Sequence, residues 1–357
     1  MKYAIRKVMN SITEQGFEAY IVGGYVRDKL LRKNSYDIDI CTSATPLDLV
    51  KIFGKQTINK YGGLSFKIGK YDFDITTYRI DGKYELGKLQ DVSFTNSLSI
   101  DLERRDFTVN TICMNKNGKI QYYFDAKKDL KNRKIKLVNN DISSLSDDPL
   151  RILRAIRFCT LLNFSMDENL KLLIQNNVDL LNNLSKEKIK SEFTKILLSD
   201  NYVYGLKLIE ELNIAKFLSV KTTNIKKSND LLVMFAQIEL NEEYFTKYET
   251  RRIKTIKNII NYGKIDNAIL FENGLYFSVS VGEILGYKTK DIYVMFDEMW
   301  INENKPLCIS GEDVKEIMNI DSGEIVGNIL EELKQEILNK KLKNEKESIE
   351  QYLRRRK

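Results

Sequence analysis

Two aspartates stand two residues apart in the stretch 36–40, and this spacing could serve metal-dependent chemistry. Polar and apolar residues alternate there as in a half-buried strand, so the side chains of Asp37 and Asp39 are expected on one face. Adjacent carboxylates repel each other and are costly to keep ionised unless a cation lies between them. Oxygen ligands of this kind suit Mg²⁺, which takes its remaining ligands from water and from substrate phosphates.

A glycine pair precedes these aspartates, between a strand-like run at 19–22 and a helix-like run at 25–31. The backbone N–H groups of Gly23 and Gly24, supported by the helix dipole, could approach a triphosphate, and Arg27 is placed to meet phosphate. Either motif alone is usually structural, since paired aspartates often belong to a solvated strand face and a glycine pair to a simple turn. Their closeness along the chain instead indicates nucleotidyl transfer.

Composition narrows the classes of protein that remain. The 357 residues are 43% hydrophobic, which is enough for two or more compact units. Basic residues outnumber acidic ones by 57 to 50, a modest excess that fits a polyanionic partner. Four cysteines without paired spacing favour reduced thiols and a cytoplasmic location. The absence of histidine excludes histidine-based acid–base chemistry, and we expect no signal peptide and no membrane partner because no run is apolar enough.

The elements that must position these residues change character along the chain. Residues 1–138 combine glycine-rich turns with short alternating runs, which predicts a mixed sheet with interleaved helices. From 139 onward, Leu-, Ile-, Lys- and Glu-rich stretches carry helical periodicity. We therefore predict an α+β protein: a head at 1–138, then all-α units at 139–200, 201–270 and 271–357. Strands are expected at 19–22, 36–40, 64–68, 72–78 and 91–94, with a hairpin near 111–123, and helices at 3–16, 25–31 and 46–53.

A helix predicted over 149–158 carries a second group of charged residues. Asp148 followed by Pro149 is the N-cap and N1 pairing typical of a helix start. Helical periodicity places the apolar residues on one side and three arginines on the opposite arc, namely Arg151, Arg154 and Arg157. Such a basic face usually meets solvent or phosphate.

Asp148 and Arg151 have the chemistry to read the edge of a base. Cytosine and adenine each present an amino donor beside an unprotonated ring nitrogen, which a carboxylate and a guanidinium can bind respectively. Guanine and uracil invert both groups and leave the charged partners unpaired. The pair could therefore select C and A without a nucleic-acid template, although the plainer interpretation of Asp148 is a helix cap.

A family resemblance rests on segments that occur in a fixed order along the chain. They are GGYVRD at 23–28, YDIDI at 36–40, RRDFTVN at 104–110, DDPLRILRAIRF at 147–158 and SKEKIKSEF at 185–193. This order resembles the class II tRNA nucleotidyltransferase and bacterial poly(A) polymerase family, a branch of the DNA polymerase β-like superfamily. The segments ISGEDV at 309–314 and IVGNIL at 325–330 are similar to the tail of the shorter bacterial CCA-adding enzymes.

The resemblance implies roles for individual residues. Two Mg²⁺ ions would be held by Asp37 and Asp39, with Asp74 as the third catalytic carboxylate; Asp72 shares the strand face of Asp74, so that choice rests on the motif. Arg105 and Asp106 would contact the ribose, with support from Asn110, although the run 104–106 would otherwise be interpreted as a solvated salt-bridge cluster. The expected nucleotide site consists of Gly23, Gly24, Arg27, Arg105, Asp106, Asn110, Asp148, Arg151, Arg154 and Arg157.

The implied activity is template-independent addition of CCA to tRNA 3′ ends from CTP and ATP, with release of pyrophosphate. Basic C-terminal helices and the run 354–357 would then follow the phosphates of the tRNA acceptor arm and T-arm. The alternatives are CC-only or A-only addition, a poly(A) polymerase, and an RNA-binding protein that kept the fold. Residues 54–57 lack the basic segment associated with bacterial poly(A) polymerases, which favours tRNA, and the intact aspartates favour catalysis.

The sequence departs from the family pattern at a few positions. Tyr122 and Ala126 stand where Asp and Gly are usual, in a segment thought to act as a hinge between head and neck, and Asp147 replaces a Glu. The loop 80–90 keeps Asp81 and Gly82 but lacks a basic-basic-proline piece that the family ties to switching from C to A addition.

Overall fold

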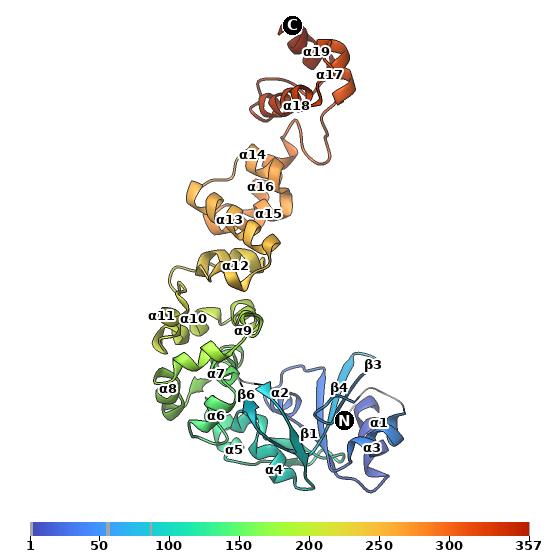
Figure 1. Cartoon of the computed structure of the whole chain (residues 1–357), viewed down its shortest axis with the longest axis vertical. Helices are drawn as coiled ribbons and strands as arrows, with labels where there is room; N and C mark the ends of the chain where they lie inside the picture. Colours follow the sequence, from blue (N-terminus) through green and yellow to red (C-terminus); the bar gives the residue numbers. More distant parts are fainter. Residues whose placement is uncertain (1–2, 55–57, 86–87, 357) are drawn as a thin grey trace. The chain divides into compact units, whose positions relative to one another are not determined.

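The computed structural model describes residues 3–54, 58–85 and 88–356 (Figure 1). Residues 55–57 of the segment compared with poly(A) polymerases, residues 86–87 of the 80–90 loop and residue 357 of the basic terminus lie outside this description. The chain divides into two compact units, Met1–Thr222 and Thr223–Lys357. The predicted four-part division into head, neck, body and tail stays a prediction.

A mixed sheet forms the centre of the head, and its strand order among the described residues is β10-β9-β1-β2-β4-β3. Strands β2 and β4 run parallel, while the other neighbouring pairs are antiparallel. The strands are β1 (Ala19–Val22), β2 (Asp37–Thr42), β3 (Gly63–Ile68), β4 (Tyr71–Thr77), β9 (Cys113–Met114) and β10 (Ile120–Gln121).

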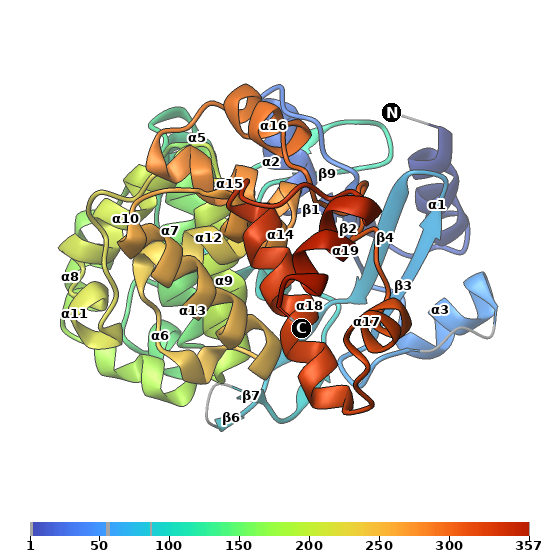
Figure 2. The same ribbon diagram turned by 90° about the horizontal axis from the view of Figure 1, so that it is seen from above.

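Helices α1 (Tyr3–Thr13) and α3 (Pro46–Phe53) lie next to this sheet (Figure 2). Their apolar residues join those of the strands in one core, which includes Ile5, Met9, Ile21, Ile40, Leu49 and Phe73. Helix α2 (Gly24–Leu30) packs against β1 and β2. The short pairs β5 (Arg79–Asp81) with β8 (Val92–Phe94) and β6 (Tyr84–Glu85) with β7 (Lys88–Leu89) precede α4 (Leu98–Glu103).

The rest of the first unit packs around one long helix, α7 (Leu150–Leu162), which contacts α9 (Lys186–Leu198) and α10 (Tyr202–Glu211). Its apolar residues Ile152, Leu153 and Ile156 are fully buried, as the periodicity predicted. The surrounding elements are α5 (Ala126–Lys131), β11 (Lys134–Ile135), α6 (Ser143–Asp147), β12 (Ser165–Met166), α8 (Glu168–Gln175), α9 (Lys186–Leu198), α10 (Tyr202–Glu211) and α11 (Ile214–Leu218).

The second unit is helical. The buried residues Leu270, Phe296, Leu333 and Ile349 belong to a core that spans its last helices. Among the described residues, no helix is long and apolar enough to cross a membrane. The helices are α12 (Leu231–Ile238), α13 (Lys247–Tyr262), α14 (Asn267–Asn273), α15 (Leu275–Leu285), α16 (Thr289–Asp297), α17 (Gly311–Met318), α18 (Gly323–Leu338) and α19 (Lys346–Arg354).

The predicted fold class, an α+β head followed by helical units, is confirmed. Strand 19–22 and helix 46–53 are confirmed to the residue, and the other predicted strands start within one residue of the expected position. Two expectations are wrong in detail. Helix 3–16 ends at Thr13, because the chain turns over 14–16 toward Gly16 with φ +86°. The region after 139 is not entirely helical, since β12 pairs with β11.

The start of α7 also differs from expectation. The helix begins at Leu150, one residue later than predicted, although Asp148 Oδ1 still accepts a hydrogen bond from the Leu150 N–H at 3.2 Å. In the hinge segment, Ala126 is buried at the first position of α5. The two residues before it, Phe124 and Asp125, have left-handed backbone, with φ 48° and 63°.

Candidate active site

A cavity of about 610 Å³ in the first unit is lined by charged side chains. All of the predicted nucleotide-site residues line it, and so do Asp37 and Asp39; Asp74 does not. The lining also includes residues that were not predicted. Asp28, Arg104 and Phe158 lie inside the family segments, so their place in those segments could have indicated them. The other unpredicted residues are Ser35, Arg79, Asp81 and Tyr84.

Strands β2 and β4 bring the carboxylates together. Their parallel register pairs Asp39 with Asp74 and Asp37 with Asp72. Burial raises the pKa of Asp39; Arg105 opposes this shift, and the charges of Asp74 and Asp37 add to it. A cation beside Asp39 would relieve both the burial cost and the repulsion.

The surroundings of Asp74 and Asp72 differ, although they share a strand face. Asp72 is 55% exposed and forms an ion pair with Lys67 at 3.2 Å. Asp74 accepts a hydrogen bond from the hydroxyl of Ser65 and lies beside Asp39 in the register. Both aspartates are exposed, and each lies beside one of the two aspartates of β2, so the assignment of Asp74 as the third carboxylate still rests on the motif.

The carboxylates of the site suit a Mg²⁺ ion that takes ligands from both the protein and the substrate. Within residues 3–54, 58–85 and 88–356, no three His, Cys, Asp or Glu side chains are arranged to hold a metal ion by themselves. Mg²⁺ usually takes only one or two carboxylates from the protein and completes its shell with waters and substrate phosphates. Asp37 and Asp39 on one strand face match this pattern.

The turn between β1 and α2 requires glycine at its first position. Gly23 has φ 73°, a left-handed conformation that costs other residues energy, and a Cβ there would lie 3.2 Å from Asp39 Oδ2. The bare backbone of the turn therefore lies directly beside the carboxylate.

We expect Gly23→Ala to destabilise the protein by about 1–2 kcal/mol and to raise the KM for nucleotide severalfold, because strain and crowding displace Asp39. Gly118→Ala is the matched control, since Gly118 has φ +82° but no heavy atom within 4 Å of a Cβ. Thermal unfolding measures the stability of both variants, and steady-state kinetics measures their KM for nucleotide. A Gly23→Ala protein with unchanged KM would show that this close approach does not matter.

A chain of hydrogen bonds links α2 to α7 through Asp106. Arg27 pairs with Asp28 at 2.8 Å and donates to Asn110 Oδ1 at 2.7 Å. Asn110 Nδ2 in turn donates to Asp106 Oδ1 at 2.9 Å, and Arg154 Nε donates to Asp106 Oδ2 at 2.9 Å. Burial opposes ionisation of Asp106, but Arg154 and Asn110 outweigh it and lower the pKa.

The run 104–106 is a partly buried network, in which Asp106 is buried and the two arginines are partly exposed, rather than a fully solvated cluster. Fully buried Asp101 binds Arg104 at 2.8 Å and Arg105 at 3.0 Å. Because the side chains of Arg105 and Asp106 both have protein partners, the ribose contacts implied for them would use their remaining hydrogen-bonding capacity.

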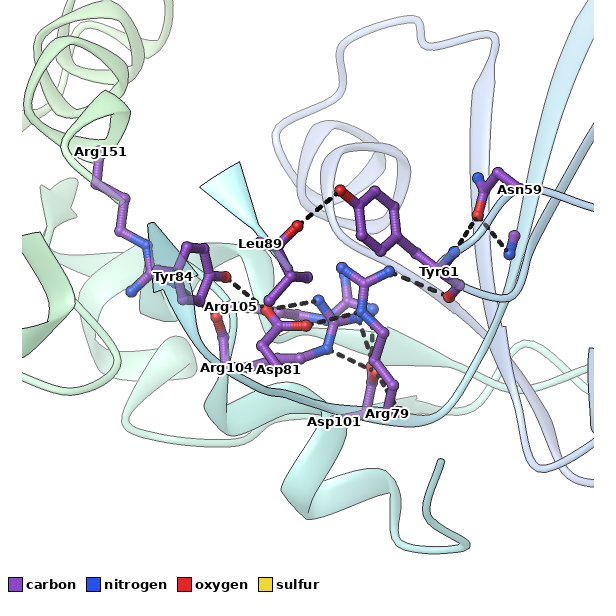
Figure 3. Close-up of polar contacts among 11 residues, drawn as sticks. Asn59, Tyr61, Arg79, Asp81, Tyr84, Leu89, Asp101, Arg104, Arg105 and Arg151 are labelled. Atoms are coloured by element: carbon purple, nitrogen blue, oxygen red, sulfur yellow. Dashed lines mark hydrogen bonds and ion pairs between the residues drawn. The ribbon is translucent and has the colours of Figure 1, made fainter. Parts of the chain in front are cut away.

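The same network ties the segment after β4 to the cavity wall (Figure 3). Asp81 pairs with Arg79 at 2.8 Å, lies 3.7 Å from Arg104, and accepts a hydrogen bond from the Tyr84 hydroxyl at 2.8 Å. The Tyr61 hydroxyl donates to the Leu89 carbonyl at 3.0 Å. Both short strands β6 and β7 are thereby connected to the head.

Helix α7 presents its basic face to the cavity and to the head rather than to solvent. Arg151 Nη2 donates to the Arg104 carbonyl at 2.7 Å, and its Nε lies 4.0 Å from Asp148 Oδ2. Arg157 pairs with Glu192 of α9 at 3.1 Å. Burial raises the pKa of Asp148, whereas Arg151 and Arg154 oppose that shift.

Three segments of the chain match known families. Residues 19–136 match the "Poly A polymerase head domain". Residues 163–221 match the "Probable RNA and SrmB- binding site of polymerase A", and residues 240–353 match tRNA nucleotidyltransferase domain 2.

Comparisons over the full length of the chain agree with these family matches. The CCA-adding enzyme of Ligilactobacillus salivarius is 31% identical in an alignment that covers 95% of this chain and 93% of that protein. The Bacillus stearothermophilus CCA-adding enzyme, solved with CTP, has a TM-score of 0.85 at 25% identity, covering 100% of this chain and 98% of the other. The Thermotoga maritima CCA-adding enzyme complexed with tRNA shares the fold, with a TM-score of 0.69 at 20% identity over 100% and 97% of the two chains.

Proposed function

This chain belongs to the family of CCA-adding enzymes, and on that premise we propose that it adds CCA to tRNA 3′ ends from CTP and ATP and releases pyrophosphate. The observation that carries the proposal is one cavity that gathers the paired aspartates, the glycine turn and the Asp148–Arg151 pair. Enzymes of this family are nucleotidyltransferases that use divalent metal ions. The cytoplasm, where tRNA and nucleotides are available, is the proposed location.

Mg²⁺ is the proposed metal, with Asp37 and Asp39 as its ligands and Asp74 as the third catalytic carboxylate. Divalent ions held by these carboxylates would lower the pKa of the incoming 3′-hydroxyl and would neutralise the charge on the leaving pyrophosphate. The pKa of Asp39 is raised first by burial and then by the charges of Asp74 and Asp37, and this supports the assignment because a bound cation would relieve both effects.

The remaining residues of the cavity hold and select the nucleotide. The N–H groups of the Gly23–Gly24 turn, together with Arg27, Arg154 and Arg157, are proposed to bind the triphosphate. Arg105, Asp106 and Asn110 are proposed to position the ribose. Asp148 accepts from the amino group of C or A, and Arg151 donates to the adjacent ring nitrogen.

A metal-dependent incorporation assay separates this activity from a non-catalytic RNA-binding protein that kept the fold. The purified chain is mixed with labelled CTP and tRNA that ends at the discriminator base. Incorporation that requires a divalent ion and stops on addition of a chelator is expected. Tight tRNA binding without incorporation would support the binding protein instead.

The four-part division into head, neck, body and tail remains our proposal, with tRNA bound through its backbone by the helical C-terminal parts. Exposed Lys247, Arg251 and Lys254 on α13 support it, as does the complex of the Thermotoga maritima relative with tRNA. Phosphate contacts of this kind depend on charge rather than on sequence.

We expect tRNA affinity to fall by roughly a hundredfold or more between about 50 mM and about 200 mM salt, because bound cations are released from the RNA. Anticodon identity should matter little. A chain ending at Thr222, the end of the first unit, should lose most tRNA affinity but retain weak nucleotide binding. Filter binding over a salt series measures these effects. Full tRNA affinity in the shortened chain would rule out the C-terminal role.

A further inference from the structure

Phe158 lines the charged cavity, and none of the roles above uses it. It lies on α7 directly after Arg157 and is half-buried. Its ring meets the fully buried ring of Phe107 edge-on, with centroids 5.5 Å apart and an interplanar angle of 77°. The ring is therefore held in place from the side of the head while part of it faces the cavity.

Three guanidinium groups lie around this ring. The Cζ atom of Arg157 is 4.5 Å from the ring centroid, that of Arg27 is 5.1 Å away, and that of Arg154 is 5.6 Å away. Arg27 belongs to α2 and the other two belong to α7, so the ring lies where the arginines of two elements converge. Like charges this close repel one another, and an aromatic ring attracts cations.

Each arginine also has one carboxylate partner, namely Asp28 for Arg27, Asp106 for Arg154 and Glu192 for Arg157. Arg27 also donates to Asn110, and Arg154 uses two of its N–H groups on Asp106. A guanidinium has five N–H donors, so each of the three arginines still has donors available. Further carboxylates would hold the arginines equally well but would cancel their charge and occupy their donors. An aromatic ring holds them through its π electrons and leaves both the charge and the N–H groups for a ligand.

We propose that Phe158 is a positioning residue for the triphosphate: its ring holds Arg27, Arg154 and Arg157 together so that they act on the phosphates as one group. The inference rests on the proposed function of the cavity. It concerns the three phosphates of the nucleotide rather than the base or the metal, and this gives it a distinct experimental signature.

Replacing Phe158 by leucine should weaken binding of CTP, ATP and inorganic tripolyphosphate about tenfold, which corresponds to about 1.4 kcal/mol. The affinity for CMP should fall less than about twofold, because its single phosphate depends little on the three arginines acting together. The KM for both nucleotides should rise, while the preference for C and A over U and G stays as in the wild type. Phe158→Tyr keeps the ring and should restore CTP binding. A residue that only fills space would affect CTP and CMP equally.

The control is Phe164→Leu, the same change at a buried aromatic residue of the first unit that does not line the cavity. Calorimetry with each ligand on the full chain measures affinity, and thermal unfolding measures stability. Phe158→Met replaces the leucine variant if that protein fails to fold. CTP affinity equal to the wild type in a folded non-aromatic variant, or equal losses for CTP and CMP, would overturn the inference. A wild-type protein that neither binds CTP nor incorporates it would instead refute the proposed function.

Discussion

Asp39→Ala is expected to abolish nucleotide transfer while the protein still folds and binds tRNA. The carboxylate lies in the wall of the cavity, beside Asp74 in the strand register and next to the Gly23 turn. Loss of a metal ligand removes stabilisation of the transition state and typically lowers the rate by several orders of magnitude. Asp37→Ala should have the same effect, because Asp37 lies on the same strand face.

The stability of the Asp39→Ala variant follows from the pKa of the native residue. A carboxyl whose pKa is raised on folding favours the protonated form, so its ionised form destabilises the metal-free protein at neutral pH. Removal of Asp39 should therefore leave the unfolding temperature of the metal-free protein unchanged or slightly higher. The substitution would then lower activity without lowering stability, as expected where a functional site retains a carboxylate whose burial destabilises the fold.

Single-turnover incorporation of CTP and thermal unfolding together test this prediction. Asp72→Ala is the matched control, because Asp72 is an exposed aspartate on the same face of the neighbouring strand, paired with Lys67. It should retain transfer close to the wild-type rate. Turnover at the wild-type rate in Asp39→Ala would contradict the assignment of Asp39 as a metal ligand.

Asp148→Ala is expected to relax base selection more than it slows transfer of a correct base. An unpaired charged group facing UTP or GTP costs roughly 1–3 kcal/mol per missing hydrogen bond, and removal of the carboxylate removes that penalty. UTP and GTP should therefore compete with CTP in this variant. Arg151→Ala should weaken CTP and ATP together, because both bases present the same ring-nitrogen acceptor.

Asp147→Ala is the control for Asp148, since Asp147 is adjacent in sequence, exposed, and outside the wall of the charged cavity. Incorporation of all four nucleotides is measured separately for each variant in a single turnover. If Asp148→Ala rejects UTP and GTP as strictly as the wild type, Asp148 serves only the start of α7, where it accepts from the Leu150 N–H.

Local sequence patterns predicted the parts of the site that depend on local structure. Alternation put Asp37 and Asp39 on one strand face, and helical periodicity separated the arginines of α7 from its buried residues. The glycine pair lies where β1 ends and α2 begins, as predicted, although α2 spans Gly24–Leu30 and so starts and ends one residue before the predicted helix 25–31. These features each involve neighbours within one or two turns or strands.

Contacts between segments far apart in the chain could not be predicted from local sequence patterns. The pairing of β3 with β4 gives Asp72 a partner in Lys67 and Asp74 a partner in Ser65, and nothing in the sequence pattern indicates these partners. The bond from Arg154 to Asp106 joins residues 48 positions apart, so periodicity along α7 could not indicate that the arginine is tied to the head. Tyr84 gave no signal because its role in the wall arises from Asp81 and the short strands around it.

The nucleotides added to a tRNA that ends at its discriminator base test the central proposal most directly. The full chain is incubated with CTP and ATP, alone and together, and the new 3′ ends are sequenced. We predict CC with CTP alone and CCA with both, with no further extension. A tail of many adenosines, an end that stays at CC with both nucleotides, or an unextended tRNA would contradict the account.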